Sequence, residues 1–414
     1  MKQIIKRETP VKNVYTPDIK NDNPEVIIPT EPMKDYEGFI RPGDDYPAKV
    51  LGDKCVKEVF ENKIADFERT AAYCERNGEK NPDLMVHVST FVIIESIVYM
   101  TYYANTSTAE EDHNNQEARL AFCPLENPDD MTIVQLQKVG DMLDGKKITR
   151  LYDTILMYKG GDELYLMWTA CPDDNYYRLY CTFNIKTKTL GPIKANRFKV
   201  GKVTNDFSMS GMKSALSYNN IPFKAMWTDI GIMQKLSTRI ENGETYYYTG
   251  AYSGNFNCII KSRDFITWEY VAAPDFINNS RWENATYVIG DKCYYFVRQQ
   301  ECEQGFLTCY DLTHGIWAKP MLITDAQSRS DFIYYNGGLY LIHAPQHREG
   351  FGIVKVNTEN INKSETLFVA NMRESCFYPY VLVYGDDAYI SYTVDRKHIR
   401  LSKFNLRNYI KEEK

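Results

Sequence analysis

Hairpins of short apolar runs, repeated about six times, dominate the pattern of hydrophobic and polar positions along this chain. Each copy has a polar cluster, a run of β-branched and aromatic residues, a tight turn and a second, tyrosine-rich run. The four clearest copies span residues 153–169, 283–298, 330–343 and 378–393. Such runs, separated by turn residues, predict antiparallel hairpins, and their repetition predicts a repeat architecture.

The spacing of the hairpins predicts the class of fold. The tyrosine-rich runs centre near Met100, Met167, Tyr247, Tyr295, Leu341 and Ile390. The last three intervals are nearly equal and lie in the range of propeller blades. We therefore expect an all-β chain folded as a β-propeller of seven blades or six, in which residues 203–229 carry either insertions or a further blade. A β-sandwich is the second choice, although it does not predict such regular intervals.

Two regions precede the repeats. Residues 1–45 are rich in Pro, Asp, Asn and Lys, which predicts an extended N-terminal arm. Residues 46–414 are expected to form a single β-propeller catalytic domain. Within it, residues 57–76 stay open between a helix and, over residues 67–73, a strand. They are the only long helical candidate, which argues against a parallel α/β fold.

Composition narrows the class of partner. The 414 residues are 43% hydrophobic, enough for a large core, and the 32 tyrosines suit half-buried sheets and sugar-facing surfaces. The net charge of −6 argues against non-specific nucleic-acid binding. The ten cysteines form no CxxC pair, so reduced, buried thiols in a reducing compartment are expected.

The N-terminus has no apolar signal segment, and the longest apolar run, residues 91–103, is broken by Glu95 and is too short to cross a bilayer. These features predict a cytoplasmic protein with no membrane partner, or a secreted one if a signal has been removed. A monomer or homodimer is expected.

Hairpin geometry predicts where a site lies. The start of a first strand and the end of the second share one end of the sheet, and in a propeller the first strands line the central axis. Polar residues at these positions are therefore expected to converge in one cup. The residues selected as catalytic are His87, Asp153, Glu283, Asp331 and Tyr378. Those selected for substrate binding are Arg150, Tyr252, Arg281, Trp282, Arg298, Arg329, His343, Gln346, Arg373 and Arg396.

The many arginines in this set indicate an anionic ligand, because guanidinium groups hold carboxylates through paired hydrogen bonds. Aromatic side chains such as Trp282 and Tyr252 are suited to stacking on sugar rings. The expected partner is an acidic oligosaccharide. Arg–Asp pairs that only bridge neighbouring blades are the structural alternative for each single arginine.

Residues 376–381 and 388–401 carry a Tyr-Pro pair before one strand and a Tyr-Ile-x-Tyr-Thr strand followed by an arginine. This pattern resembles the last full blade of sialidase-like propeller enzymes, a group that includes sialidases, rhamnosyl-glucuronate hydrolases and ulvan-type lyases. The segment Ser262–Trp268 resembles the turn of many glycosidase propellers, without the turn glycine of the sialidase Asp-box. That resemblance implies that Trp268 packs between strands.

A glycoside hydrolase acting on a uronate- or sialate-containing glycan is the leading hypothesis. Hydrolysis uses two carboxyl groups, for which Asp153, Glu283, Asp331 and Glu374 are candidates, or a tyrosine nucleophile with an acidic base. Tyr378 paired with Glu374 or Glu283 provides the tyrosine variant.

Two alternatives stay open. A polysaccharide lyase needs an arginine to neutralise the uronate carboxylate and a base, for which His87, assisted by Tyr102 or Tyr103, or else His343 is suited. A non-catalytic glycan-binding propeller is the other. No cofactor is expected, although the loop of residues 112–116 is either a solvated loop or a structural calcium or substrate contact.

Overall fold

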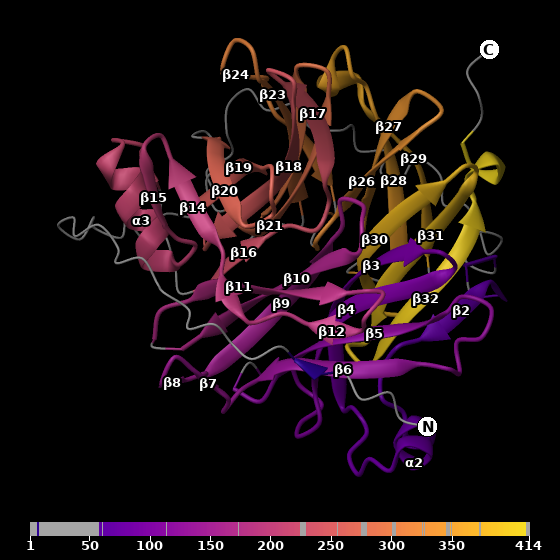
Figure 1. Cartoon of the computed structure of the whole chain (residues 1–414). Coiled ribbons are helices and arrows are strands. Elements are labelled where there is room, and N and C mark those ends of the chain that lie inside the picture. Colours follow the sequence, from indigo (N-terminus) through magenta and orange to yellow (C-terminus); the bar gives the residue numbers. More distant parts are fainter. Residues whose placement is uncertain are drawn as a thin grey trace.

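The computed structural model is all-β and describes residues 6–7, 58–59, 61–112, 114–172, 174–223, 229–254, 256–274, 280–299, 304–324, 326, 328–344, 348, 350–371 and 374–410. Six sheets of four to seven strands surround a common axis, as blades of a propeller (Figure 1). The prediction of an all-β propeller is confirmed, and six blades, the lower of the two predicted numbers, are formed by the described residues.

The first two blades follow the same hairpin order. The first blade consists of β3 (Met85–Ile94), β4 (Ile97–Asn105), β5 (Glu117–Pro124) and β6 (Thr132–Lys138). The second consists of β9 (Arg150–Met157), β10 (Glu163–Cys171), β11 (Tyr177–Asn184), β12 (Thr189–Leu190) and β13 (Lys194–Ala195). A small hairpin, β7 (Met142–Leu143) and β8 (Lys146–Lys147), lies between them.

The remaining blades complete the ring. The third has β14 (Arg197–Val200), β15 (Val203–Asp206), β16 (Ile230–Ile232), β17 (Ser237–Glu241), β18 (Glu244–Ser253), β19 (Phe256–Ser262) and β20 (Thr267–Ala272). The fourth has β21 (Ser280–Ile289), β22 (Lys292–Gln299), β23 (Gln304–Asp311), β24 (Ile316–Trp317) and β25 (Met321–Thr324). The fifth has β26 (Asp331–Tyr335), β27 (Gly338–His343), β28 (Gly350–Val356) and β29 (Glu365–Asn371). The sixth has β30 (Cys376–Tyr384), β31 (Asp387–Val394), β32 (His398–Asn405) and β2 (Lys63–Asp66).

The sixth blade joins the two ends of the propeller. Strand β2 precedes the first blade in sequence, yet it pairs antiparallel with β32, with Ala65 opposite Leu401. The backbone amide of Phe67 continues this pairing to the carbonyl of Ile399 at 2.9 Å. Closing the ring with an N-terminal strand covers an edge that would otherwise expose unpaired backbone groups.

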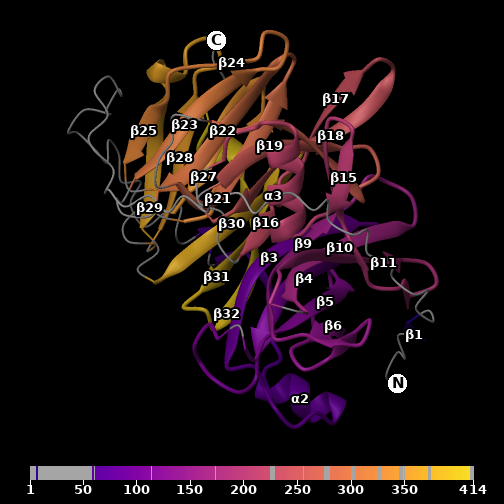
Figure 2. The ribbon, with the colours of Figure 1, turned by 90° about the vertical axis from the view of Figure 1, so that its left-hand side faces the viewer.

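The segment left open, residues 57–76, ends in a helix, and the alternative of a strand over residues 67–73 is wrong because the strand here, β2, ends at Asp66. After β2, helix α2 (Ala71–Asn77) starts at Thr70, whose hydroxyl accepts the amide of Tyr73 at 3.1 Å, and ends at Gly78 in the left-handed conformation. Figures 1 and 2 both place α2 at the outer edge of the first blade. The backbone amide of Ile133 in β6 donates to the Tyr73 hydroxyl at 3.2 Å, which fixes the helix there.

Residues 203–229 carry an insertion in the third blade. Strand β14 joins this blade through a parallel pairing with β20, and β15 and helix α3 (Met209–Tyr218) follow at its outer side (Figure 1). No additional blade is formed by the described part of this stretch. Of the predicted N-terminal arm, the structure describes residues 6–7, strand β1 (Lys6–Arg7), which pairs parallel with β12; the rest lies outside the described residues.

The core lies between the faces of neighbouring blades. Trp168 from β10 is fully buried between the first and second blades, where its indole donates to Gln137 of β6 at 2.7 Å. Burial of such a side chain stabilises the fold by about 3 kcal/mol. Two 3₁₀ turns, η2 (Ile361–Lys363) and η3 (Leu406–Asn408), follow strands of the fifth and sixth blades. No helix of the described residues is both long and apolar enough to cross a membrane.

The turn at Ser262–Trp268 is held by its own polar side chains. The Ser262 hydroxyl accepts the amide of Phe265 at 2.9 Å, and a carboxylate oxygen of Asp264 accepts the amides of Ile266 and Thr267, each at 2.8 Å. Phe265, which with Ile266 stands where the Asp-box has its turn glycine, takes the left-handed conformation with φ of 64°. Trp268 is fully buried, so it packs the blade.

Candidate active site at the propeller axis

The inner strands of three blades change backbone conformation at corresponding places. Val88 in β3, Asp153 in β9 and Tyr378 in β30 all have positive φ, at 54°, 55° and 60°. The pairing register slips after His87 and after Phe377 at these positions. An additional residue of this kind makes a β-bulge, which re-aims side chains, and a non-glycine residue in this conformation costs on the order of 1 kcal/mol or more. The backbone is therefore strained where Asp153 and Tyr378 leave their strands.

Tyr378 and Glu283 are hydrogen-bonded to each other across the axis. The Tyr378 hydroxyl, from the sixth blade, donates to one carboxylate oxygen of Glu283 from the fourth blade. The other oxygen of Glu283 pairs with the guanidinium of Arg298 at the end of β22. Glu283 is 4% exposed. The hairpin of the fourth blade thus brings a base and a cation to one tyrosine hydroxyl.

The environment fixes the protonation of this pair. Burial raises the pKa of Tyr378, and the nearby Glu283 charge raises it further, against the opposite effect of three arginines. Burial alone would raise the pKa of Glu283, but the charges of Arg298 and Arg329 and the hydrogen bond from Tyr378 outweigh it and hold this pKa below its usual value. A neutral phenol therefore lies beside an ionised carboxylate, the arrangement of a nucleophile and its general base.

Asp153 is held on both oxygens by groups from three blades. Arg329 pairs with one oxygen, and the Tyr252 hydroxyl donates to the other at 3.1 Å. Arg178 of β11 lies 3.4 Å from that second oxygen and donates to the Asp153 carbonyl at 2.5 Å. Asp153 is 3% exposed. Both carboxylate oxygens of Asp153 thus have partners within the protein, and Asp153 anchors Arg178 and Arg329 at the axis.

Arg329 connects the Asp153 group to the Tyr378 pair. Its guanidinium carbon lies 5.1 Å from the centre of the Tyr378 ring. Asp153 therefore holds Arg329 against the ring of the tyrosine whose hydroxyl meets Glu283, and the two predicted groups form one network.

His87 packs directly on the same tyrosine. Its ring centre lies 4.3 Å from that of Tyr378 and 5.2 Å from that of Phe377, and its Nδ1 lies 3.0 Å from the hydroxyl of Thr393. Burial lowers the pKa of His87 well below its usual value, and nearby arginines, with Arg396 first among them, lower it further. The imidazole is therefore neutral at pH 7.

A half-exposed carboxylate lies beside this group. Arg348 and Arg396 lie over the ring of Phe377, with guanidinium carbons 5.3 Å and 5.2 Å from its centre. Arg396 bonds one oxygen of Glu111 at 3.0 Å, and the Tyr103 hydroxyl donates to the other. The Glu111 side chain is 30% exposed, unlike Asp153 and Glu283.

All six blades contribute to this network, which we call the axial cluster. Its members are His87, Tyr103, Glu111, Asp153, Arg178, Tyr252, Glu283, Arg298, Arg329, Arg348, Tyr378 and Arg396. Eight of them were selected from the sequence: His87, Asp153, Tyr252, Glu283, Arg298, Arg329, Tyr378 and Arg396.

Three predicted residues have other surroundings. Asp331 accepts a hydrogen bond from the Val381 amide at 2.8 Å and pairs with Lys235 at 2.9 Å, so it joins buried parts of three blades. Arg150 is exposed and donates to Tyr176 at 2.6 Å. His343 is buried against Gly352 of the neighbouring strand, where a Cβ would lie 2.4 Å from the imidazole Nε2. Gln346 and Arg373 lie outside the described residues, as do the side chains of Arg281 and Trp282.

Sequence reasoning missed Glu111, Arg178 and Arg348. Arg178 lies on β11, the third strand of its blade, which the hairpin alignment did not consider. Glu111 lies in the loop after the second strand of the first blade, and its acidic run, residues 110–112, was the signal available. Arg348 follows the second strand of the fifth blade by several residues, so only tertiary structure brings it to Phe377.

Hydrogen bonds within the loop hold residues 112–116. Asp112 accepts the backbone amide of Asn114 at 3.0 Å and the side-chain amide of Asn115 at 2.6 Å, while His113 lies outside the described residues. No group of three or more metal-ligating side chains occurs among the described residues.

Comparison with known proteins identifies the fold. No family model and no curated protein sequence matches this chain. Its structure is similar to that of the Trypanosoma rangeli sialidase in complex with sialic acid, with a TM-score of 0.54 at 12% identity, over 84% of this chain and 58% of the sialidase. It is also similar to the Hadza microbial sialidase Hz136, with a TM-score of 0.57 at 9% identity, over 79% of this chain and 67% of that one. The chain has the sialidase-like propeller fold, and spans less than two thirds of the Trypanosoma rangeli enzyme.

Proposed function

We propose that this protein is a glycoside hydrolase that releases a carboxylated sugar of the sialic acid class, with Tyr378 as nucleophile and Glu283 as its general base. The observation that carries this proposal is the hydrogen bond from the hydroxyl of the half-buried Tyr378 to the ionised Glu283, next to Arg298. The likeness of the fold to sialidases supports the same class of reaction.

A neutral tyrosine suits a sugar whose anomeric carbon bears a carboxylate. An aspartate or glutamate nucleophile would approach such a carbon against the repulsion of like charges. The Tyr378 hydroxyl carries no charge until Glu283 removes its proton during attack. A tyrosine nucleophile thus favours a sialate over a uronate, because the carboxylate of a uronate is remote from the anomeric carbon.

The arginines supply the binding partner for that carboxylate. The charges of three of them, Arg298, Arg329 and Arg348, lower the pKa of the Tyr378 hydroxyl, whereas the charge of Glu283 raises it. Burial lowers the pKa of Arg348, and the neighbouring Arg298 and Arg396 charges contribute to the same effect. A bound carboxylate would relieve this repulsion and accept paired hydrogen bonds from guanidinium groups.

The proposed reaction has two steps. Tyr378 Oη bonds to the anomeric carbon as its proton passes to Glu283, while the bond to the leaving oxygen breaks and that oxygen takes a proton from the acid form of Glu111. Water then attacks the anomeric carbon, giving its proton to the Glu111 carboxylate, and Tyr378 Oη leaves with the proton held by Glu283. Glu111 is assigned the proton transfer because it is the half-exposed carboxylate of the axial cluster.

Trapping of the first intermediate tests this function. A 2,3-difluorinated sialic acid would lose fluoride from its anomeric carbon as Tyr378 Oη attacks, and its remaining fluorine would slow hydrolysis of the adduct. Intact-protein mass spectrometry should show one added sugar for the wild type and none for Tyr378→Phe, and peptide mapping should place it on Tyr378. Sugar attached at a carboxylate, or release of sialic acid from sialyllactose that persists in Tyr378→Phe, would reject the assignment.

A lyase is the second candidate, because the ring centre of neutral His87 lies 4.3 Å from that of Tyr378, among arginines. His87 would remove the C5 proton of a uronate, and Tyr378 would protonate the leaving oxygen. Polyuronate that gains the ultraviolet absorbance of an unsaturated uronate would favour it. Sialyllactose cleaved without that absorbance favours the hydrolase, and binding of either glycan without cleavage favours a glycan-binding propeller.

A further inference from the structure

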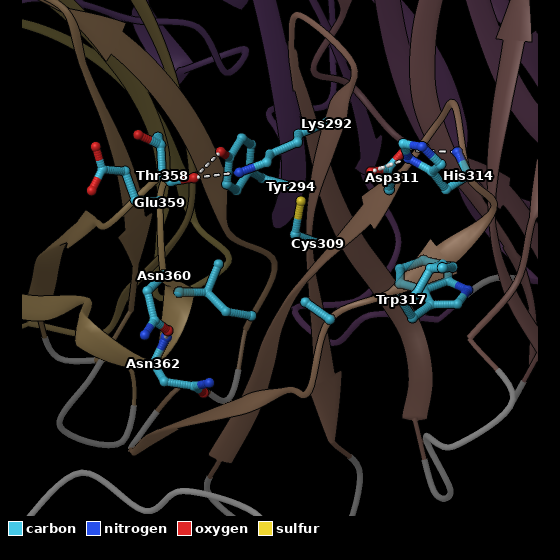
Figure 3. A pocket seen from close by; sticks show the side chains of 13 residues that line it. Lys292, Tyr294, Cys309, Asp311, His314, Trp317, Thr358, Glu359, Asn360 and Asn362 are labelled. Atoms are coloured by element: carbon cyan, nitrogen blue, oxygen red, sulfur yellow. Dashed lines mark hydrogen bonds and ion pairs between the residues drawn. The ribbon is translucent and has the colours of Figure 1, made fainter.

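A cavity lies between the fourth and fifth blades, far from the axial cluster. Its volume is about 310 Å³, and it opens between the β23–β24 region and the loop of residues 358–362 (Figure 3). Lys292, the first residue of β22, lines it, whereas Arg298 of the axial cluster lies six residues further along the same strand. At strand geometry this separation is about 20 Å, so the cavity is a separate site.

One wall of the cavity is an aromatic side chain fixed in place. Trp317 of β24 is half-buried, with its ring centre 5.6 Å from that of Tyr295 and 4.8 Å from that of Tyr310. These contacts fix the orientation of the indole, so that little side-chain entropy remains to be lost when a ligand packs on it. Ile361 is a further apolar residue of the lining.

Two amide side chains lie across from the indole in Figure 3. The Asn360 oxygen accepts the backbone amide of Asn362 at 3.1 Å, which fixes the side chain at the start of the 3₁₀ turn η2. The side-chain oxygen of Asn362 is buried and accepts no hydrogen bond from the described residues. A buried acceptor of this kind is unfavourable without a donor, and a turn of the Asn362 side chain toward the cavity would let a bound hydroxyl provide one.

The charges around the cavity compensate one another. Lys292, Asp311 and Glu359 line it, together with the titratable His314. His314 Nδ1 lies 3.0 Å from Asp311, and this hydrogen bond raises the pKa of His314 and lowers that of Asp311 to about 2. Lys292 donates to the Thr358 carbonyl at 3.0 Å, as Figure 3 shows. The lining therefore favours a neutral ligand, unlike the arginine-rich axial cluster.

We propose that this cavity binds one neutral sugar ring, with its apolar face on Trp317 and a hydroxyl donating to Asn362. Its volume lies at the lower end of the range for small-molecule sites, and it combines an aromatic surface with a few fixed polar groups. The site is independent of the function proposed for the axial cluster. In a glycan-processing enzyme it would hold a neutral part of the chain outside the axis.

Saturation-transfer NMR with the methyl glycosides of glucose, galactose and rhamnose tests this site on the full chain. At least one probe should receive saturation, and Trp317→Ala should weaken its binding by about tenfold or more, as expected for a truncated aromatic anchor. Asn362→Ala should also weaken it while leaving the aromatic wall intact. Circular dichroism melting shows which variants remain folded.

Matched controls distinguish binding at this site from binding at the axis and from non-specific binding to the protein surface. Tyr378→Phe, in the axial cluster, and Tyr218→Ala, which removes an aromatic ring that is 58% exposed on α3, should leave binding of the probe unchanged. The proposal is overturned if none of the three glycosides binds, or if binding persists in both folded Trp317→Ala and folded Asn362→Ala. Binding lost in Tyr378→Phe would equally reject it, because the probe would then occupy the axis.

Discussion

At Tyr378, the environment keeps the phenol neutral and supplies a base to deprotonate it. Burial and the Glu283 charge both raise the pKa of the hydroxyl, so the free phenolate is unfavourable. The same Glu283 accepts the hydrogen bond of that hydroxyl. A proton transfer that is unfavourable in the free protein becomes useful when the oxygen forms a bond in the same step.

Replacement of these two residues should separate activity from stability. Tyr378→Phe should lower kcat on a sialylated glycan by at least about a thousandfold, since the nucleophile is lost, and Glu283→Gln by about a hundredfold or more, since the base is lost. Initial-rate kinetics provide the measurement. Tyr384→Phe, on a tyrosine that is 44% exposed, is the control and should keep full activity. Wild-type turnover in folded Tyr378→Phe would contradict the proposed role.

Asp331 predicts a specific pH dependence of stability. Burial raises its pKa to about 6, because pairing with Lys235 does not fully offset the loss of hydration. Its ordinary value, about 3.9, applies to the unfolded chain. The folded state thus retains a proton that the unfolded state has released, and the contribution of this group to stability, complete below about pH 4, is lost as the pH rises through about 6.

Asp331→Asn lacks this titration and is the test of it. The free energy of unfolding of the wild type minus that of Asp331→Asn should become smaller between pH 4.5 and pH 7, with a slope of up to about 1.4 kcal/mol per pH unit. Urea unfolding at several pH values measures both proteins. A difference that grows or stays constant over this range would show that Asp331 is not the titrating group.

At the scale of elements, β-bulges in the inner strands direct side chains into the axial cluster. Val88, Asp153 and Tyr378 take the left-handed conformation at corresponding points of three inner strands. Regular strands would send alternate side chains to opposite faces of the sheet, into the packing between blades. The bulges instead direct Asp153 and Tyr378 to partners in other blades.

The start of the helix that follows the closing strand is capped by Thr70. Thr70→Ala removes the hydroxyl that accepts the Tyr73 amide and should destabilise the fold by about 1 kcal/mol, whereas Thr70→Ser should keep most of the stability. Thermal or urea unfolding of the three proteins measures this difference. Equal stability of Thr70→Ala and the wild type would mean that α2 contributes nothing to the cooperative unit.

At the scale of the whole molecule, buried ion pairs tie the blades together at the axis. Asp153 of the second blade meets Arg329 of the fifth and Tyr252 of the third, and Asp331 of the fifth meets Lys235 of the third. Such contacts connect elements that are far apart in sequence. Asp153 therefore serves both the axial cluster and the contacts between blades.

Asp153→Asn tests this dependence. It keeps the shape of the side chain but leaves Arg178 and Arg329 buried without their anion, so stability should fall by about 3–5 kcal/mol, as for other broken buried pairs. Urea unfolding provides the value. Asp162→Asn, which breaks an exposed pair with Lys186, is the matched control and should change stability by less than about 1 kcal/mol. Similar effects of both substitutions would show that Asp153 does not join the blades.

Hairpin periodicity was sufficient to predict the propeller and much of the axial cluster. The start of an inner strand and the end of the next strand lie at the same end of the blade. The places of Glu283, Arg298 and His87 in the axial cluster could therefore be predicted from their positions in the repeat. Arg178 and Glu111 did not, because one lies on a third strand and the other in a loop. Asp331 and His343 occupy predicted positions, but register and packing direct their side chains into buried surroundings of their own.

The sequence by itself determined the all-β class, the repeating hairpins and the gathering of arginines and carboxylates at strand ends, because turn residues and β-branched runs act locally. Only the tertiary structure decided that β2 closes the sixth blade, that residues 203–229 add an insertion, and that Tyr378 pairs with Glu283 instead of Glu374. Glu374 meets Arg400 at 3.1 Å. Such choices depend on how blades face one another across the axis, where burial and charge act between residues that the sequence keeps far apart.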